Sequence, residues 1–259
     1  MNHRTARSLR HEYGLYVERE IEDYKDSIPR SVILSIGDEA VASLRAQEQL
    51  ALDEMVLWDE VDRIIKKRLR IPTYQTWRRR RLKMLAKYKR PEHWGLQPDE
   101  PLVRAIDGAA PESHVLVAGA KVEGAALFLA ARGCDVTALE PAADAVERVL
   151  SAAEAAGLTS RVRGYVSDLG HWEPDVALQA VVCTPEAFEG LTLSERSHVI
   201  TVLQSATSDG GVHLVETIVA GRTAMTLDEL RSSYAGWQIS VERELGAPPC
   251  FLARKATTA

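Results

Sequence analysis

From residue 114 onward, short apolar runs alternate with longer amphipathic stretches. The runs that have the length of buried strands are His114–Gly119, Cys134–Leu139, Val162–Val166, Leu178–Cys183 and Val212–Val219. The stretches with the spacing of helices are Gly124–Arg132, Ala142–Ala156 and Leu193–Thr207. The pair Gly210–Gly211 predicts a turn before the last of these strands. This alternation predicts an α/β fold with a doubly wound, mostly parallel sheet covered by helices on both faces.

Residues 1–90 have the pattern of helices without strands. The stretch Leu9–Lys25 carries charges of both signs, with apolar and aromatic residues at helical spacing. Asp38–Leu69 contains neither proline nor glycine, and its apolar residues recur at steps typical of a helix. We therefore expect one helix of about thirty residues there. Thr73 is a candidate N-cap for a further helix that runs through Lys89.

Prolines and glycines interrupt both patterns between residues 91 and 111. This segment contains Pro91, Gly95, Pro98, Pro101, Gly108 and Pro111. Such a composition is typical of a connector rather than of a helix or a strand. We therefore expect a helical domain over 1–90, a Pro-rich connector over 91–111 and an α/β domain over 112–259.

The charges are distributed very unevenly along the chain. The whole sequence has a net charge of −5, with 32 basic and 37 acidic side chains. Residues 66–90 hold twelve of the basic side chains and no acidic one, so the other 20 basic and 37 acidic side chains sum to −17. A basic segment of this kind can contact the phosphates of a nucleic acid or an acidic protein partner. It can equally pair with the acidic remainder of the chain or with a second subunit.

The long helix expected over 38–69 also suggests a mode of assembly. Its apolar positions exceed what one short neighbouring helix could cover. The helix can therefore pack across a two-fold axis and form a homodimer, or it can cover the α/β domain as a lid. The pattern of residues leaves both alternatives open.

Other features of the sequence limit the class of protein. No run approaches the roughly 18 apolar residues of a membrane helix, and no apolar signal-peptide core follows the basic N-terminus. We therefore expect a cytoplasmic protein that does not contact a membrane. Cys134, Cys183 and Cys250 stand far apart, so we expect buried free thiols. We expect no metal site, because the histidines and cysteines lack the spacing of ligands.

The run Val115–Glu140 resembles motifs I and II of class I S-adenosylmethionine-dependent methyltransferases. Within that superfamily, the register of Leu127–Gly133 is similar to the tellurite-resistance methyltransferase group. So is the pairing of Glu229–Trp237 with a closing strand at Phe251–Lys255. The resemblance covers residues 112–256. It implies a Rossmann-like fold that binds S-adenosylmethionine and transfers a methyl group to a small molecule or an oxyanion.

The resemblance also implies a set of cofactor-binding residues. They are the turn of Gly119 and Ala120 after the first strand, Glu140 and Pro141 after the second, Asp168 and Leu169 after the third, and Cys183 at the end of the fourth. In such a site a glycine lets the backbone approach the methionine part of the cofactor. A carboxylate at Glu140 would accept hydrogen bonds from both ribose hydroxyls, and Asp168 would lie near the adenine. The edge that starts at Cys183 would face the place of methyl transfer.

Departures from the family pattern leave a second hypothesis open. The family has an acid near the end of the first strand, followed by three alternating glycines. Here Val117 replaces the acid, and Lys121 and Glu123 replace the second and third glycine. The alternative is therefore a catalytically inactive methyltransferase fold, a scaffold that binds a protein or a nucleic acid through its basic helical region.

Individual residues also have two interpretations. Asp168 can bind the cofactor or cap a turn, and Cys183 can be a nucleophile or a small buried apolar residue. His171 and Trp172 can line a substrate pocket or belong to a packed surface loop. No residue is identified as catalytic.

Overall fold

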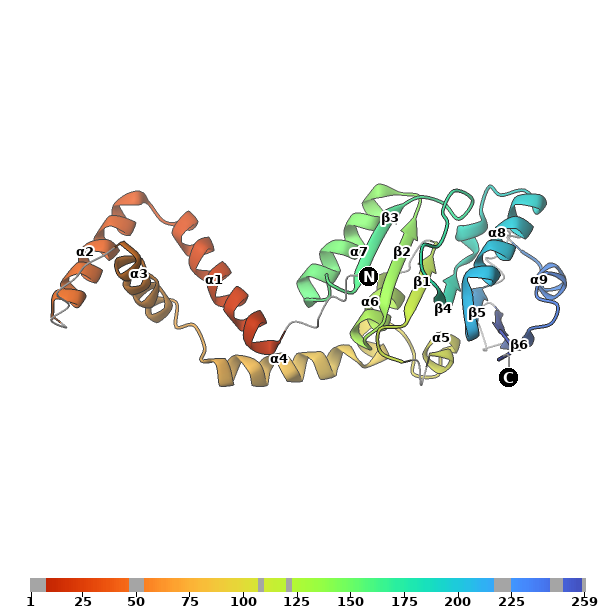
Figure 1. Cartoon of the computed structure of the whole chain (residues 1–259), viewed down its shortest axis with the longest axis horizontal. Coiled ribbons are helices and arrows are strands. Elements are labelled where there is room, and N and C mark those ends of the chain that lie inside the picture. Colours follow the sequence, from red (N-terminus) through yellow and green to blue (C-terminus); the bar gives the residue numbers. More distant parts are fainter. Residues whose placement is uncertain are drawn as a thin grey trace. The chain divides into compact units, whose positions relative to one another are not determined.

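The computed structural model describes residues 8–46, 54–106, 110–119, 123–216, 225–242 and 249–257. The chain divides into two compact units, Met1–Met84 and Leu85–Ala259. The first unit is helical and the second contains the sheet (Figure 1). No helix of the described ranges is both long and apolar enough to cross a membrane.

The first unit is built from helices whose apolar sides meet. These helices are α1 (Leu9–Ser27), α2 (Arg30–Ala46), α3 (Glu54–Arg68) and the start of α4 (Tyr74–Tyr88). Ser8 caps α1, because its hydroxyl accepts a hydrogen bond from the amide of His11 at 3.2 Å. Ile21 of α1, Ile36 of α2 and Ile65 of α3 are buried together in one cluster. This cluster holds the first three helices together.

The prediction of a single helix over 38–69 is wrong. Helices α2 and α3 pack against each other, which two halves of one straight helix cannot do. Arg68 forms an ion pair with Glu39, although 29 residues would separate them by about 43 Å along a continuous helix. The helical periodicity was real, but it came from two helices that bury their apolar faces on each other. Residues 47–53, between them, lie outside the described residues.

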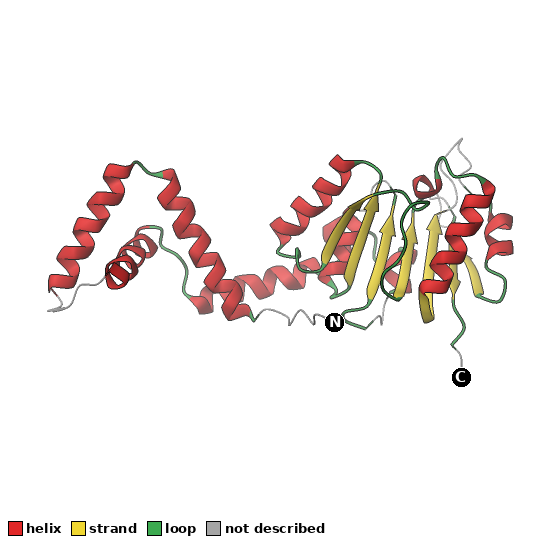
Figure 2. Cartoon of the chain, turned by 45° about the horizontal axis from the view of Figure 1, so that its top comes forward, coloured by secondary structure: helices red, strands yellow, loops and turns green. Residues whose placement is uncertain are grey.

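The second unit contains a seven-stranded sheet in the order β3-β2-β1-β4-β5-β7-β6. The strands are β1 (His114–Ala118), β2 (Asp135–Glu140), β3 (Val162–Val166), β4 (Leu178–Cys183), β5 (Thr207–Glu216), β6 (Gln238–Glu242) and β7 (Cys250–Arg254). The first five pair in parallel, and β7 is antiparallel to both of its neighbours. Helices cover both faces of this sheet (Figure 2). The expected α/β fold with a doubly wound, mostly parallel sheet is confirmed.

Strand β1 shows why its sequence is apolar throughout. Val115 and Val117 are buried in one cluster, which includes Phe128 of α6 (Glu123–Ala131). That cluster also receives side chains of α7 (Ala143–Ala156). The intervening Leu116 and Ala118 are buried in a second cluster, with side chains of α8 (Leu193–Ala206) and α9 (Leu227–Ser233). Successive residues of a strand point to opposite faces, so a strand covered on both faces is apolar at every position.

The segment 91–111, where we expected a connector, contains two short helices, η1 (Pro91–Trp94) and α5 (Pro101–Ala105). Leu102 and Ile106 are buried in the same cluster as Val117. A β-carbon added to Gly124 would lie 2.5 Å from the carbonyl oxygen of Trp94. Gly124 therefore lets η1 approach the start of α6 closely, which gives this glycine a packing role.

The C-terminal part of the sheet differs from the expected pattern. The predicted turn at Gly210–Gly211 is wrong, because both residues lie within β5. The ladder between β4 and β5 is irregular there, and Gly210 has a φ of +73°. The glycines thus allow an irregular backbone conformation within a strand and do not form a turn that reverses the chain. Strand β6 was not expected, and residues 217–219 of the predicted fifth strand lie outside the described residues.

Candidate functional site

The order of the strands reverses between β1 and β4, and the ends of β1, β2 and β4 meet beside this reversal. The amide of Gly119 donates to the carbonyl of Leu139 at 3.2 Å, and the amide of Thr184 donates to the carbonyl of Ala118 at 3.0 Å. The backbone therefore fixes the ends of β2 and β4 on the two sides of the end of β1. In doubly wound sheets, ligands bind in the crevice outside the carboxyl ends of the strands at such a reversal.

Gly119 occupies a position that only glycine fits. Its φ is +101°, and an added β-carbon would lie 2.1 Å from Oγ1 of Thr184 and 3.0 Å from the amide nitrogen of Ala187. A residue with a side chain would be strained there and would collide with the chain after β4. The expected neighbours Ala120 and Lys121 lie outside the described residues.

Thr184, the residue after β4, carries an unusual hydroxyl group. Its Oγ1 is buried and has no hydrogen-bond partner among the described residues. Leaving a buried hydroxyl without a partner costs about 1–3 kcal/mol, so such groups are rare and call for an explanation. A polar atom of a ligand that lies next to Gly119 would supply the missing partner.

Glu140, at the end of β2, is a buried acidic residue at the same edge of the sheet. The residue is 3% exposed, and no described residue forms a hydrogen bond or an ion pair with its carboxylate. Burial raises the pKa of Glu140, and Glu186 adds to this effect, while the positive charge of Arg148 opposes it. A buried carboxylate without donors is unfavourable, whereas hydroxyl groups of a ligand would stabilise it. Pro141 follows it on the surface.

The structure places Asp168 in a turn after β3. Its Oδ1 accepts a hydrogen bond from the amide of His171 at 3.1 Å and lies 2.8 Å from Nδ1 of the same residue. These contacts, His171 first, lower the pKa of Asp168. The side chain of Leu169 is buried in the core beneath, and Trp172 packs against that core. Asp168 therefore caps this turn, and the side chain of His171 remains 82% exposed.

Cys183 does not have the environment of a nucleophile. It is 1% exposed, and burial raises the pKa of its thiol to about 12. A protonated, inaccessible thiol is unreactive. Cys134 and Cys250 are also free and buried, so the expected state of all three cysteines is confirmed. The described residues contain no group of three or more histidine, cysteine or acidic side chains that could hold a metal ion.

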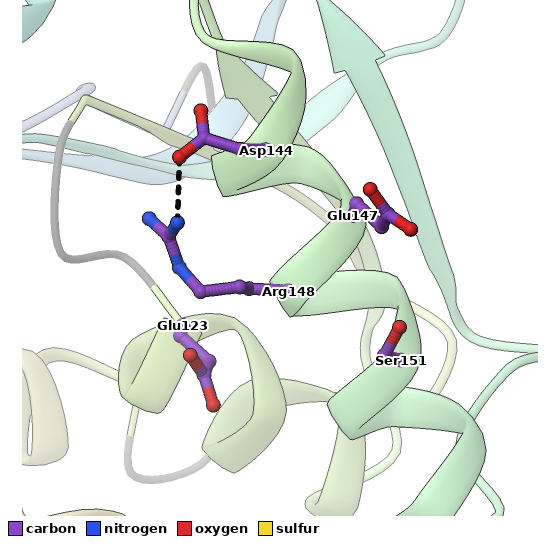
Figure 3. Close-up of a pocket in the computed structure, with 5 residues that line it drawn as sticks. All are labelled: Glu123, Asp144, Glu147, Arg148 and Ser151. Carbon is purple, nitrogen blue, oxygen red and sulfur yellow. Dashed lines mark hydrogen bonds and ion pairs between the residues drawn. The ribbon is translucent and has the colours of Figure 1, made fainter.

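An open pocket of about 480 Å³ lies beside this edge and was not expected from the sequence. It is lined by Glu123 of α6 and by Asp144, Glu147, Arg148 and Ser151 of α7 (Figure 3). Arg148 donates a hydrogen bond to Asp144 at 2.8 Å. The four-residue spacing of Asp144 and Arg148 on α7 is visible in the sequence. That Glu123 of α6 lies across the pocket from them depends on the tertiary structure. Glu123 lines this pocket. The atoms nearest to the position that a β-carbon on Gly119 would occupy belong instead to Thr184 and Ala187.

No protein-family model matches the chain, and no curated protein matches it. Among solved structures, TehB from Haemophilus influenzae is similar over 60% of this chain and 61% of its own, with 18% identity and a TM-score of 0.49. This chain thus spans about three fifths of the length of TehB.

The N-methyltransferase NodS from Bradyrhizobium japonicum is similar over 62% of this chain and 99% of its own, with 13% identity and a TM-score of 0.49. The [4+2]-cyclase SpnF is similar over 61% and 80%, with 16% identity and a TM-score of 0.48. Likenesses of this size concern the fold and decide nothing about the reaction.

Proposed function

We propose that the chain is an S-adenosylmethionine-dependent methyltransferase that acts on a small molecule or an oxyanion. The observation that carries the proposal is the carboxylate of Glu140, which belongs to a buried residue at the end of β2 beside Gly119 and has no hydrogen-bond partner among the described residues. The two hydroxyls of a ribose would donate to the two carboxylate oxygens and remove the cost of burying them. The choice of acceptor rests on the resemblance of Leu127–Gly133 to the tellurite-resistance group.

The neighbouring residues fit the other parts of the cofactor. Gly119 and Ala120 would border the methionine portion, where a side chain on Gly119 has no room. Oγ1 of Thr184 would hydrogen-bond to a polar atom of the bound molecule. Because the carboxylate of Asp168 is engaged by His171, we assign the adenine contact to the backbone near Leu169 and not to that carboxylate.

The cofactor would supply a methyl group on a positively charged sulfur. The residues of the chain would contribute by holding the reactants in line and by excluding water, which lowers the barrier without a protein nucleophile. The thiol of Cys183 is buried in the core and would have no chemical role in the transfer. We assign no general base.

An inactive scaffold is the second candidate, and Val117 is the observation that favours it. Its side chain is fully buried in the core between β1 and the helices, where the family has an acid. The chain therefore lacks that carboxylate as an anchor for the amino group of the cofactor. Such a protein would keep the fold and bind a partner through its helical region.

Calorimetric titration of the full chain with S-adenosylmethionine distinguishes the two candidates. We expect saturable binding in the micromolar range, weakened at least about tenfold by Glu140→Gln, because a hydrogen bond to a charged group contributes about 1.5–3 kcal/mol. The matched control is Glu147→Gln, which removes the same charge from the pocket between α6 and α7 and should leave the affinity unchanged. The absence of binding by the unmodified chain would support the scaffold.

A further inference from the structure

Helix α4 directs its cationic side chains to different sides. Tyr74 and Trp77 pack in an aromatic cluster with Tyr13 and Tyr16 of α1, with ring centroids 5.5–6.5 Å apart. Arg81 lies on the same side, and its Nε donates to the carboxylate of Glu12 at 3.2 Å. This inner face fixes how α4 lies on α1. It also removes Arg81 from the cations that are available to a partner.

Arg79 and Lys83 lie on the side of α4 that faces away from this cluster, and Arg80 borders it, where its charge also reaches Tyr16 of α1. Successive residues of a helix are about 100° apart, so Arg79, Arg80 and Lys83 fall within an arc of about 100°. All three side chains are exposed, and no described residue forms an ion pair with any of them. Four consecutive arginines would be expected to spread around a helix. With Arg81 turned inward, Arg79 and Arg80 lie within the same arc as Lys83.

These three cations are unfavourable for the helix by themselves. Arg79 and Lys83 are four residues apart and Arg80 and Lys83 three apart, which places like charges next to each other. No acidic residue occurs anywhere in 66–90 to compensate them. A partner with closely spaced negative charges would relieve this repulsion.

We propose that Arg79, Arg80 and Lys83 form a binding surface for the phosphate backbone of a nucleic acid. Arginine presents several N–H groups in a planar arrangement that matches phosphate oxygens, and phosphates of a strand recur closely enough to meet neighbouring side chains. A membrane surface fits less well. The exposed apolar residues of α4, Leu82 and Met84, lie about 200° apart around the helix and form no common apolar face. This proposal does not depend on cofactor binding.

The test uses the full chain and a fluorescently labelled, single-stranded RNA of mixed sequence, with binding followed by anisotropy. Each neutralised phosphate of a single strand contributes about −0.7 to the slope of log affinity against log salt. Three contacts therefore predict that affinity falls about twentyfold between about 50 and about 200 mM salt. Replacing Arg79, Arg80 and Lys83 together by glutamine should reduce the slope by about 2 and the affinity at low salt by at least about tenfold.

The matched control replaces Arg30, Arg45 and Lys67 by glutamine, three exposed cations on α2 and α3 of the same unit. This control variant should bind as the unmodified chain does. The proposal is overturned if the RNA does not bind, if binding ignores salt, or if both triple variants lose affinity equally. It is likewise overturned if polyglutamate displaces the RNA at an equal concentration of charge, since the partner would then be an acidic protein. Both triple variants should leave S-adenosylmethionine binding unchanged.

Discussion

Oγ1 of Thr184 lies 2.1 Å from the point that a β-carbon on Gly119 would occupy. The two residues follow the adjacent parallel strands β1 and β4. Glycine is required at position 119 because the chain after β4 packs directly against it. The same hydroxyl lacks a hydrogen-bond partner among the described residues. One residue pair therefore combines a need for glycine with a buried hydroxyl group that lacks a hydrogen-bond partner among the described residues.

Gly119→Ala should destabilise the second unit. The backbone strain of the positive φ and the collision with Thr184 should together lower the free energy of unfolding by about 2–4 kcal/mol. Gly190→Ala is the matched control, because Gly190 also has a positive φ but has nothing within 4 Å of an added β-carbon. Its loss should be about 1–2 kcal/mol, from strain alone. Urea unfolding of both variants measures the difference, and equal losses would argue against the contact.

Thr184→Val should separate stability from binding. The substitution removes a buried hydroxyl without a partner, so the free protein should gain about 1 kcal/mol in unfolding free energy. Affinity for S-adenosylmethionine should fall several-fold. Thr207→Val is the control, since Oγ1 of Thr207 donates to the carbonyl of Leu203 at 2.6 Å and contacts His213. That variant should lose stability. A loss of stability in Thr184→Val would show that the hydroxyl has a partner within the protein.

Gly124→Ala tests the packing of η1 on α6. The added methyl group would lie 2.5 Å from the carbonyl oxygen of Trp94, so we expect a loss of about 1–3 kcal/mol in unfolding free energy. Gly37→Ala, within α2 and with nothing within 4 Å of the added carbon, should instead gain about 0.5–1 kcal/mol. Thermal unfolding provides the comparison, and a gain in Gly124→Ala would contradict the close approach.

His213 makes the protein sensitive to acid. It is fully buried, with Nε2 and Nδ1 each 2.7 Å from the hydroxyls of Thr207 and Tyr234. Burial, and then the charge of Lys255, lowers its pKa from 6.5 to about 3. Between these values the unfolded chain binds more protons than the folded one, so the contribution of His213 to stability is present above about pH 6.5 and is lost as the pH falls.

The expected loss from His213 between pH 7 and pH 5 is about 2 kcal/mol in the free energy of unfolding. His213→Gln should remove this part of the pH dependence, and His198→Gln, at an exposed position, should keep it. Urea unfolding at the two pH values measures both. An unchanged pH dependence in His213→Gln would contradict the assignment.

The sequence predicted the elements that are bounded by clear signals. Strands β1 to β4 and helices α6, α7 and α8 end within one residue of the expected positions. Each of these elements is an apolar or amphipathic run bounded by polar residues or glycine. The spacing of its apolar residues and the positions of its ends are therefore both visible in the sequence. Strand β6 was missed because Gln238–Ser240 are exposed, so it lacks a buried apolar run. The turn at Gly210–Gly211 was wrong because glycine marks irregular strands as well as turns.

The site was predictable only in part. Glu140 could be identified from its place after the second strand, but its burial and its lack of a partner depend on what packs around it. The capping of the turn by Asp168 was one of two alternatives that local sequence allows. The contact between Gly119 and Thr184 joins residues 65 positions apart, and no local pattern signals it. The packing of α2 against α3 was hidden for the same reason, because it joins residues that are far apart in the sequence.

A crystal structure of the full chain grown with S-adenosylhomocysteine tests the central claim most directly. The claim is that the carboxylate of Glu140, which has no hydrogen-bond partner among the described residues, receives the hydroxyls of a ribose. We predict both ribose hydroxyl oxygens within about 2.5–3.0 Å of the Glu140 carboxylate, with the rest of the ligand beside Gly119 and Thr184. A ligand bound elsewhere, for example between α6 and α7 at Glu147, or a site that stays empty at saturating ligand, would contradict the account.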